Sequence, residues 1–158
     1  NVGPERMMDR HSVGGRASRW RVNMERGSVD EHPLDDLISE FGMIKPDVAG
    51  KPYHYVWEMT TKPGWFLFNG VTRLNVKTGE RQAYEFPTGV YASESPVVPA
   101  RTNGREDGGF VVTIVSDMNE DSSSCLVFNA DDLTHGPVAT IQLPERVCVG
   151  THSYWENV

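Results

Sequence analysis

A short pattern that recurs about every fifty residues constrains the fold of this 158-residue chain more than any other feature. In each copy an apolar residue precedes an asparagine and polar turn residues follow, as in "VNMERG", "LNVKTG" and "FNADDL". The asparagines are Asn23, Asn75 and Asn129, and the strand-like run after each turn ends at a proline. A repeat of this length, with about four strands in each unit, is typical of β-propeller blades.

The segments around these turns favour an all-β fold. Runs such as "SRWRVNM", "HYVWEM", "GVTRLNV", "GFVVTIVSD", "SCLVFNA" and "VATIQL" are β-branched or aromatic and are bounded by Gly, Pro, Asn and Asp. The best window of helical period, "LDDLISEF", is short. Asn69-Gly70, between "WFLF" and "VTRLNV", predicts a type I′ hairpin turn, because both central positions of that turn need positive φ.

The repeats also predict how much of a propeller is present. The sequence contains the outer hairpin of one blade, two complete blades and the inner strand of another. A propeller needs about 4 to 8 blades to close around its axis. We therefore expect residues 1–158 to be the C-terminal portion of a single β-propeller domain, with the remaining blades absent from this chain.

Composition excludes some classes of partner. Fifteen basic and twenty-two acidic residues give a net charge of −7, and no dense basic cluster is present, so a nucleic-acid partner is not expected. No run approaches the ~18 apolar residues of a membrane helix, and we expect a cytoplasmic protein. Cys125 and Cys148 lie in apolar strand-like runs without metal-binding spacing, and we expect both to be buried free thiols.

The innermost strand of each blade lines the central channel, so residues at the same phase of successive repeats should converge there. The three inner strands read "ISEF", "YASESPVV" and "VCVGTHSYW", and each offers one ionisable residue in an apolar or small setting: Glu40, Glu94 and His152. Two carboxylates and an imidazole suit a metal site, because a neutral imidazole binds the ion while a carboxylate orients the ring through its other N–H.

Simpler interpretations of these residues stay open at this point. A histidine in a strand is more often a hydrogen-bonded core or rim residue, and a carboxylate at a strand end often caps backbone amides. The remaining histidines fall in loops or at strand edges without a partner at ligand spacing, and we expect them to be solvated. They are His11, His32, His54 and His135.

Seven segments occur together in a familiar order. They are "SEF", "GKPYHYVW", "LNVKTGE", "SESPVVPA", "DGGFVVTIVSD", "LVFNADDL" and "IQLPERVCVGTHSYW". From Arg19 onward the chain resembles the C-terminal third of the carotenoid cleavage oxygenases, a family that also includes retinoid isomerases and stilbene-cleaving dioxygenases.

The resemblance implies a seven-bladed β-propeller with a non-haem ferrous ion, Fe(2+), held on its axis by four histidines that three glutamates steady. His152 matches the last iron-binding histidine, and Glu40 and Glu94 match two of the glutamates, whereas the other ligands would lie in the absent blades. No catalytic residue beyond this metal site is implied. Two departures are visible: Ser153 stands where the family usually has Gly, and Gly42 stands where a proline commonly follows the phenylalanine of "SEF".

The expected function is therefore that of the C-terminal part of an iron(II)-dependent dioxygenase. It would cleave a C=C bond of a carotenoid, apocarotenoid or stilbene-like substrate. The implied partners are dioxygen, an apolar polyene or phenylpropanoid alkene, the missing blades, and a membrane surface touched through regions outside this chain. The alternatives are a non-catalytic β-propeller interaction domain, whose axial polar residues only plug the channel, and an oxygenase fragment that is inactive by itself.

Overall fold

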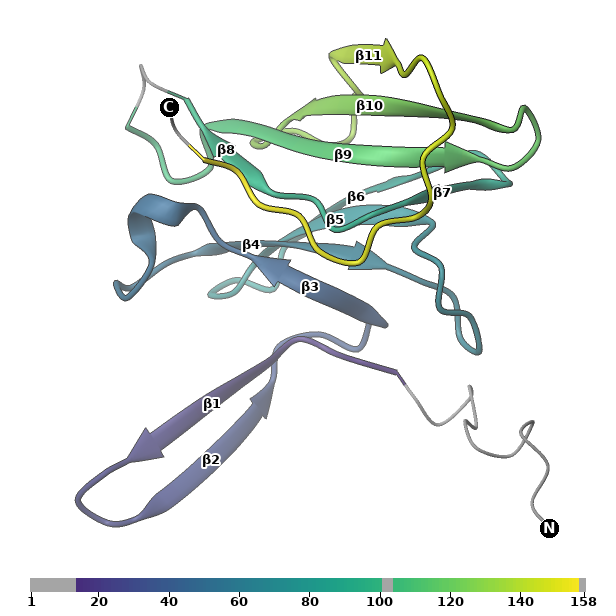
Figure 1. Cartoon of the computed structure of the whole chain (residues 1–158). Coiled ribbons are helices and arrows are strands. Elements are labelled where there is room, and N and C mark those ends of the chain that lie inside the picture. Colours follow the sequence, from purple (N-terminus) through teal and green to yellow (C-terminus); the bar gives the residue numbers. More distant parts are fainter. Residues whose placement is uncertain (1–13, 101–103, 157–158) are drawn as a thin grey trace, which may run out of the picture.

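The computed structural model describes residues 14–100 and 104–156, which form antiparallel β-structure in three parts (Figure 1). A hairpin, β1–β2, is followed by a first sheet with the order β3-β4-β5-β6 and a second sheet with the order β11-β10-β9-β7. The strands are β1 (Ser18–Asn23), β2 (Ser28–Pro33), β3 (Ser39–Met43), β4 (Tyr55–Thr60), β5 (Gly70–Asn75), β6 (Arg81–Glu85), β7 (Val90–Ala92), β8 (Val97–Pro99), β9 (Gly109–Asp117), β10 (Ser122–Asn129) and β11 (Ala139–Gln142).

Helical structure in the described part of the chain amounts to one 3₁₀ turn at Pro46–Val48. Within the same ranges, no helix is long and apolar enough to cross a membrane. The expectation of an all-β chain is therefore confirmed for the residues that the structure describes.

The three repeated asparagines occupy equivalent hairpin positions, as the sequence predicts. Asn23 ends β1, Asn75 ends β5 and Asn129 ends β10, and each is followed by the turn into the outermost strand of its part. The Oδ1 atoms of Asn23 and Asn75 accept hydrogen bonds at 3.0–3.2 Å from the amides two and three residues further on. In the third turn Asp132 takes this role, because its Oδ1 accepts a hydrogen bond from the Thr134 amide at 3.0 Å.

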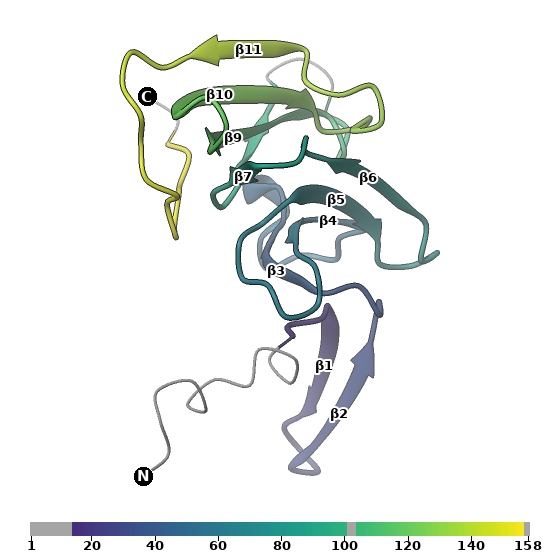
Figure 2. The same ribbon diagram turned by 90° about the vertical axis from the view of Figure 1, so that its right-hand side faces the viewer.

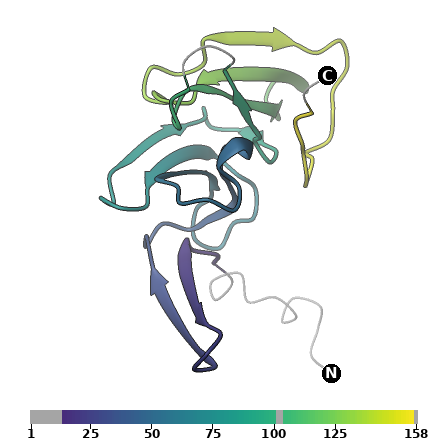
Figure 3. The same cartoon turned by 90° about the vertical axis from the view of Figure 1, so that its left-hand side faces the viewer.

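The two sheets share one plan. In each, chain order equals spatial order from the first strand to the outermost one, and every pairing is antiparallel. In the second sheet the first strand is divided, because β7 and β8 both pair with the same edge of β9. Figures 2 and 3 show the second sheet, the first sheet and the hairpin following one another down the molecule.

The main core lies between the two sheets. Trp57 and Met59 on β4 belong to the same buried cluster as Val111 on β9 and Phe128 on β10. The Trp57 indole N–H donates a 3.0 Å hydrogen bond to the carbonyl of Ala130, so its polar atom is satisfied inside this core. Burying these aromatic and aliphatic side chains is the main force that holds the sheets together.

The opposite faces of the two sheets differ. A smaller cluster of Val56, Leu74 and Val76 covers the far side of the first sheet, with Leu34 packed against it. The first sheet is therefore buried on both faces. By contrast, large apolar side chains stand exposed on the hairpin and on the far side of the second sheet. They include Trp20, Val22, Phe110, Ile114 and Ile141.

The predicted Asn69-Gly70 turn is wrong. Residues 61–69 connect β4 to β5, and Gly70 already lies inside the sheet, paired with Thr60 on one side and Glu85 on the other. A Cβ atom at Gly70 would lie 2.6 Å from the Thr60 Oγ1 and 3.0 Å from the Tyr84 carbonyl oxygen. Glycine is required here by the close approach of neighbouring strands.

The inner strand predicted for "VCVGTHSYW" is also wrong, because residues 147–155 contain no strand. The run is apolar enough for a strand, but no neighbouring strand of the described chain pairs with it. Figure 1 shows this segment (yellow) descending from β11 and passing beside β7 and β8.

We predict that Gly70→Ala lowers the free energy of unfolding by about 1–3 kcal/mol, because the added methyl group is forced against Thr60 and the Tyr84 carbonyl. Asn69→Ala should change it by less than about 0.5 kcal/mol, since no turn depends on that side chain. Thermal or urea unfolding measures both, and Thr60→Ala should restore part of the stability of Gly70→Ala. A large loss in Asn69→Ala would show that residues 69 and 70 do form a tight turn.

The first sheet contains a buried carboxylate. Glu58 on β4 is only 6% exposed, and its Oε2 atom has no hydrogen-bond partner. Burial, together with the nearby negative charge of Asp35, raises the pKa of the Glu58 carboxyl. The folded state therefore binds this proton more tightly than the unfolded chain does. The contribution of Glu58 to stability falls as the pH rises from its ordinary pKa of 4.5 through the raised value.

We predict that Glu58→Gln raises the unfolding midpoint at neutral pH, because the buried charge is removed while the side-chain volume is kept. The difference from wild type should shrink toward zero as the pH is lowered below 4.5, where the wild-type carboxyl is protonated in both states. Thermal unfolding at a series of pH values tests this. Glu120→Gln, on the exposed β9–β10 turn, is the control and should change neither quantity. A lower midpoint in Glu58→Gln at neutral pH would contradict the prediction.

Candidate metal centre

Glu94 lies where the first strand of the second sheet is interrupted. β7 ends at Ala92, paired with Val115, and β8 begins at Val97, paired with Val111. Residues 93–96 therefore lie opposite only residues 112–114, which is the geometry of a β-bulge. The bulge turns Glu94 out of the regular ladder and toward the segment that carries His152.

Glu40 lies at a matching irregularity in the first sheet. Glu40 pairs with Met59 and Met43 pairs with Trp57, so residues 41–42 of β3 lie opposite Glu58 alone. Phe41 adopts a positive φ of 55°, which is uncommon for a bulky residue and strained. Both glutamates therefore stand at a bulge in the first strand of their sheet, in agreement with the phase argument from the sequence.

The segment that carries His152 is held by side chains and lacks a strand ladder. Its backbone amides at positions 147, 150 and 153 each donate a hydrogen bond to a side chain of the second sheet or its bulge. The acceptors are the Ser123 hydroxyl at 3.0 Å, the Ser93 hydroxyl at 2.9 Å and the Glu94 carboxylate at 2.6 Å. The Ser116 hydroxyl also donates to the Val147 carbonyl at 2.9 Å.

The His152 ring lies beside the Glu94 carboxylate. The Nδ1 atom is 3.4 Å from the Glu94 Oε2, and the side chain of Glu94 is 11% exposed whereas that of His152 is 79% exposed. The Phe41 ring meets the imidazole edge to face at a centroid distance of 5.4 Å. No hydrogen bond to Nε2 is found among the described residues. A carboxylate at one ring nitrogen and an open second nitrogen form the arrangement that metal-binding histidines use.

The structure brings together two of the three predicted site residues. Glu94 faces His152, whereas Glu40 is exposed and forms no hydrogen bond or ion pair with either of them in the described structure. Glu40 is linked to His152 only through its neighbour Phe41. The simpler interpretation of Glu94 also holds in part, because its carboxylate does cap a backbone amide, that of Ser153.

Within residues 14–100 and 104–156, no three His, Cys, Asp or Glu side chains are grouped so that they could hold a metal ion. Around His152, the described residues therefore offer one imidazole with one carboxylate beside it. Any complete site would need ligands from elsewhere.

A largely apolar cavity of about 270 Å³ adjoins His152, between residues 147–155 and the outer face of β9 and β10. Cys125 and Cys148 both line it and both are free thiols, as predicted. The expected burial is wrong, however, because Cys148 is exposed and Cys125 is half-buried. Cys125 points away from the inter-sheet core, and Cys148 lies in the segment that does not form a strand.

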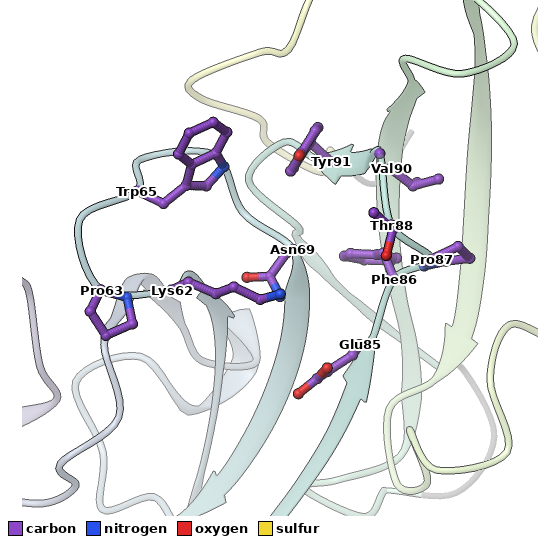
Figure 4. Close-up of a pocket in the computed structure, with 11 residues that line it drawn as sticks. Lys62, Pro63, Trp65, Asn69, Glu85, Phe86, Pro87, Thr88, Val90 and Tyr91 are labelled. Carbon is purple, nitrogen blue, oxygen red and sulfur yellow. The ribbon is translucent and has the colours of Figure 1, made fainter.

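A second hollow, of about 330 Å³, lies between the 61–69 loop and the connection from β6 to β7 (Figure 4). The Lys62 side chain extends across it toward Asn69, and the Trp65 and Tyr91 rings, which also line it, have centroids 6.3 Å apart. This hollow shares no lining residue with the cavity beside His152.

Sequence reasoning was wrong about His54. Its Nδ1 lies 2.8 Å from the Glu106 Oε2, and Glu106 also accepts hydrogen bonds from the amides of His54 and Tyr55. Although burial opposes the effect, these bonds lower the pKa of the Glu106 carboxyl. His135 is exposed and pairs with Asp132, and His32 is exposed. His11 lies outside the described residues.

Several residues of the site were missed by sequence reasoning. The sequence marks Phe41 only as part of the "SEF" motif and Ser153 only as a departure from the family pattern. The serines that anchor the His152 segment follow no recognisable motif, although the spacing of three between residues 147, 150 and 153 is a signal of its own. That spacing has no meaning until the segment is known not to be a strand.

We predict that Cys148 reacts with a maleimide faster than Cys125. Cys148 is exposed, whereas partial burial raises the pKa of the Cys125 thiol and so lowers the fraction present as the reactive thiolate. Mass spectrometry after timed labelling should show one fast and one slow addition, and Cys148→Ser should abolish the fast one. Equal rates at the two thiols would contradict the geometry of residues 147–155.

The chain resembles known proteins over most of its length. The family described as "Retinal pigment epithelial membrane protein" (RPE65) matches residues 3–157. Carotenoid 9,10(9′,10′)-cleavage dioxygenase 1 of Arabidopsis thaliana is 29% identical over 155 residues, which cover 90% of this chain and 28% of that protein. Lignostilbene-α,β-dioxygenase isozyme III of Sphingomonas paucimobilis is 24% identical, with coverage of 88% and 31%. The chain thus spans less than a third of the length of these relatives.

Solved structures agree in fold. The cobalt-substituted apocarotenoid oxygenase of Synechocystis superposes with a TM-score of 0.88 at 19% identity, covering 96% of this chain and 32% of that one. The lignostilbene dioxygenase of Pseudomonas brassicacearum gives a TM-score of 0.79 at 25% identity, with coverage of 85% and 31%. With residues 3–157 matched by the family, the chain belongs to the RPE65 and carotenoid cleavage oxygenase family.

Proposed function

We propose that this chain is the C-terminal part of an iron(II)-dependent dioxygenase that cleaves a C=C bond of a carotenoid, apocarotenoid or stilbene-like substrate. In this proposal the two sheets are complete blades of a seven-bladed β-propeller. The β1–β2 hairpin is the outer half of the preceding blade, and residues 147–155 belong to the following one.

The observation that carries the proposal is the pairing of His152 with Glu94. A carboxylate that accepts the Nδ1–H of an imidazole fixes the tautomer and leaves Nε2 as a lone-pair donor. The Glu94 Oε2 lies 3.4 Å from that nitrogen, and no described residue bonds to Nε2. An imidazole held only for packing would not need a buried carboxylate on one side and an open nitrogen on the other.

The residues present fit a ferrous ion in chemistry, although they supply only part of a site. Imidazole nitrogen is a suitable ligand for iron, and His152 would be the ligand from this chain. When bound, the ion would supply the dioxygen and redox chemistry of double-bond cleavage, which side chains lack. Glu94 would hold the Nδ1 proton, and Phe41 would limit rotation of the ring from the other side. A solved neighbour in cobalt-substituted form, with a TM-score of 0.88, supports a metal site in this fold.

Apolar side chains exposed at the two ends of the molecule support the propeller architecture. The first sheet is covered on both faces, whereas the hairpin and the far face of the second sheet display large apolar side chains such as Trp20 and Ile141. Apolar groups that face water cost about 25 cal/mol per Å² relative to burial. Further blades on both sides would remove this cost, and relatives of which this chain covers less than a third have the residues to supply them.

The substrate class rests on the named relatives. Their names include carotenoid cleavage dioxygenases and a lignostilbene dioxygenase, and carotenoids and stilbenes share a C=C bond between conjugated groups. We propose the same class for the complete protein, with dioxygen as the second substrate.

We predict that His152→Ala abolishes iron-dependent alkene cleavage by the full-length gene product. Glu94→Gln should leave iron partly bound and lower activity by about 10- to 100-fold, because it keeps an acceptor of the same shape but loses the charge. Iron content by elemental analysis and product formation from a carotenoid and a stilbene measure both. Glu40→Gln should have a smaller effect than Glu94→Gln, because in the described structure the carboxylate beside the ring is that of Glu94.

Comparison with residues 1–158 alone completes the test. One imidazole cannot replace a full set of ligands, so the isolated chain should bind ferrous iron weakly or not at all, whereas the full-length protein should hold about one iron. Tight stoichiometric binding by the isolated chain would refute this account of the site. A full-length protein that is folded but free of iron and inactive would favour a non-catalytic propeller instead.

A further inference from the structure

We propose that Ser153 is a positioning residue that sets the orientation of His152 through Glu94. The inference deepens the proposed metal site and in that sense rests on it. It concerns the consecutive residues His152 and Ser153 and the glutamate that both of them contact, Glu94.

Two hydrogen bonds join Ser153 to Glu94. The Ser153 amide donates to the Glu94 Oε2 at 2.6 Å, and the Ser153 hydroxyl donates to the Glu94 backbone carbonyl at 2.7 Å. The same Oε2 atom lies 3.4 Å from the His152 Nδ1. One carboxylate oxygen therefore lies beside the imidazole and accepts the amide of the next residue along the chain.

This arrangement matters because little else fixes the His152 ring. The side chain is largely exposed, its segment has no strand ladder, and the described ring contact is the edge of Phe41. The next anchored amide in the segment is that of Gly150, three residues before Ser153, and it donates a hydrogen bond to the Ser93 hydroxyl. The direction of the imidazole thus depends on how firmly residue 153 is held against Glu94.

The hydroxyl bond adds something that the amide bond alone does not provide. Glu94 lies in the bulge between β7 and β8, and its backbone carbonyl faces residues 147–155. The Ser153 hydroxyl satisfies that carbonyl and ties the backbone of the bulge to the His152 segment. With both ends of Glu94 held, its carboxylate faces Nδ1 without having to be ordered when a metal binds.

Variants of residue 153 separate the two bonds. Ser153→Ala keeps the amide donor and removes only the hydroxyl, whereas Ser153→Thr keeps a hydroxyl at the same position. Ser116→Ala is a matched control, because it removes a serine hydroxyl that anchors the same segment at Val147, away from Glu94. A loss of local stability alone should appear in both alanine variants.

The first readout needs no metal. Nitrogen NMR of the neutral His152 ring reports which nitrogen carries the proton. We expect the Nδ1–H form to predominate in wild type, Ser153→Thr and Ser116→Ala, and the ring to shift toward the Nε2–H form in Ser153→Ala. A wild-type tautomer ratio in Ser153→Ala would overturn the positioning role. So would an equal shift in Ser116→Ala, because the effect would then be one of general loosening.

The second readout uses the full-length protein loaded with cobalt(II), whose visible absorption reports ligand geometry. In the cobalt-loaded protein Ser153→Ala should change the spectrum and speed cobalt loss about 10-fold, and in the iron-loaded protein it should lower kcat with little change in KM. Ser153→Thr should restore all three. An unchanged spectrum and rate would overturn the inference while leaving the proposed function intact. If wild type itself bound no metal, the proposed function would fail, and the tautomer measurement would still decide whether Ser153 orients the ring.

Discussion

The packing of the two sheets against each other is the interaction on which the rest of the structure depends. The core between them joins Trp57 of β4 to Phe128 of β10, and the Trp57 indole hydrogen bond to Ala130 fixes how the sheets meet. Phe41 belongs to the first sheet and Glu94 to the second, yet both border the same imidazole. The two sides of the candidate site therefore meet only because an apolar core has already placed one sheet against the other.

The residues of the site occur where the regular backbone pairing fails. Phe41 lies in the bulge of β3 with a positive φ, Glu94 lies in the interruption between β7 and β8, and His152 lies in a segment without a ladder. A regular strand directs every side chain to one of two faces. A bulge redirects one side chain at modest cost, because the sheet on either side keeps its pairing. Breaks in the ladder thus allow side chains to point in directions that a regular sheet does not permit.

Much of the fold could be predicted from the sequence because the repeat and the strands depend on local patterns. Asn23 and Asn75 cap their own turns, and period-two runs correspond to β4, β9 and β10. Features that depend on distant partners could not be predicted. The sequence predicts a turn at Gly70, but a glycine is needed there because Thr60 and Tyr84 on the neighbouring strands leave no room for a side chain.

The same distinction applies to the candidate site. The phase of the repeats selected Glu94 and His152, and the structure places them together; for Glu40 the phase gave the position in the strand but not a contact. The two interpretations of Glu94, as a cap for a backbone amide and as a support for an imidazole, are compatible, because an ionised carboxylate has about four acceptor sites. The hydrogen bond from the Ser153 amide restricts rotation of the Glu94 carboxylate even without a bound ion. By capping the Ser153 amide, Glu94 is therefore already positioned to support the imidazole of His152.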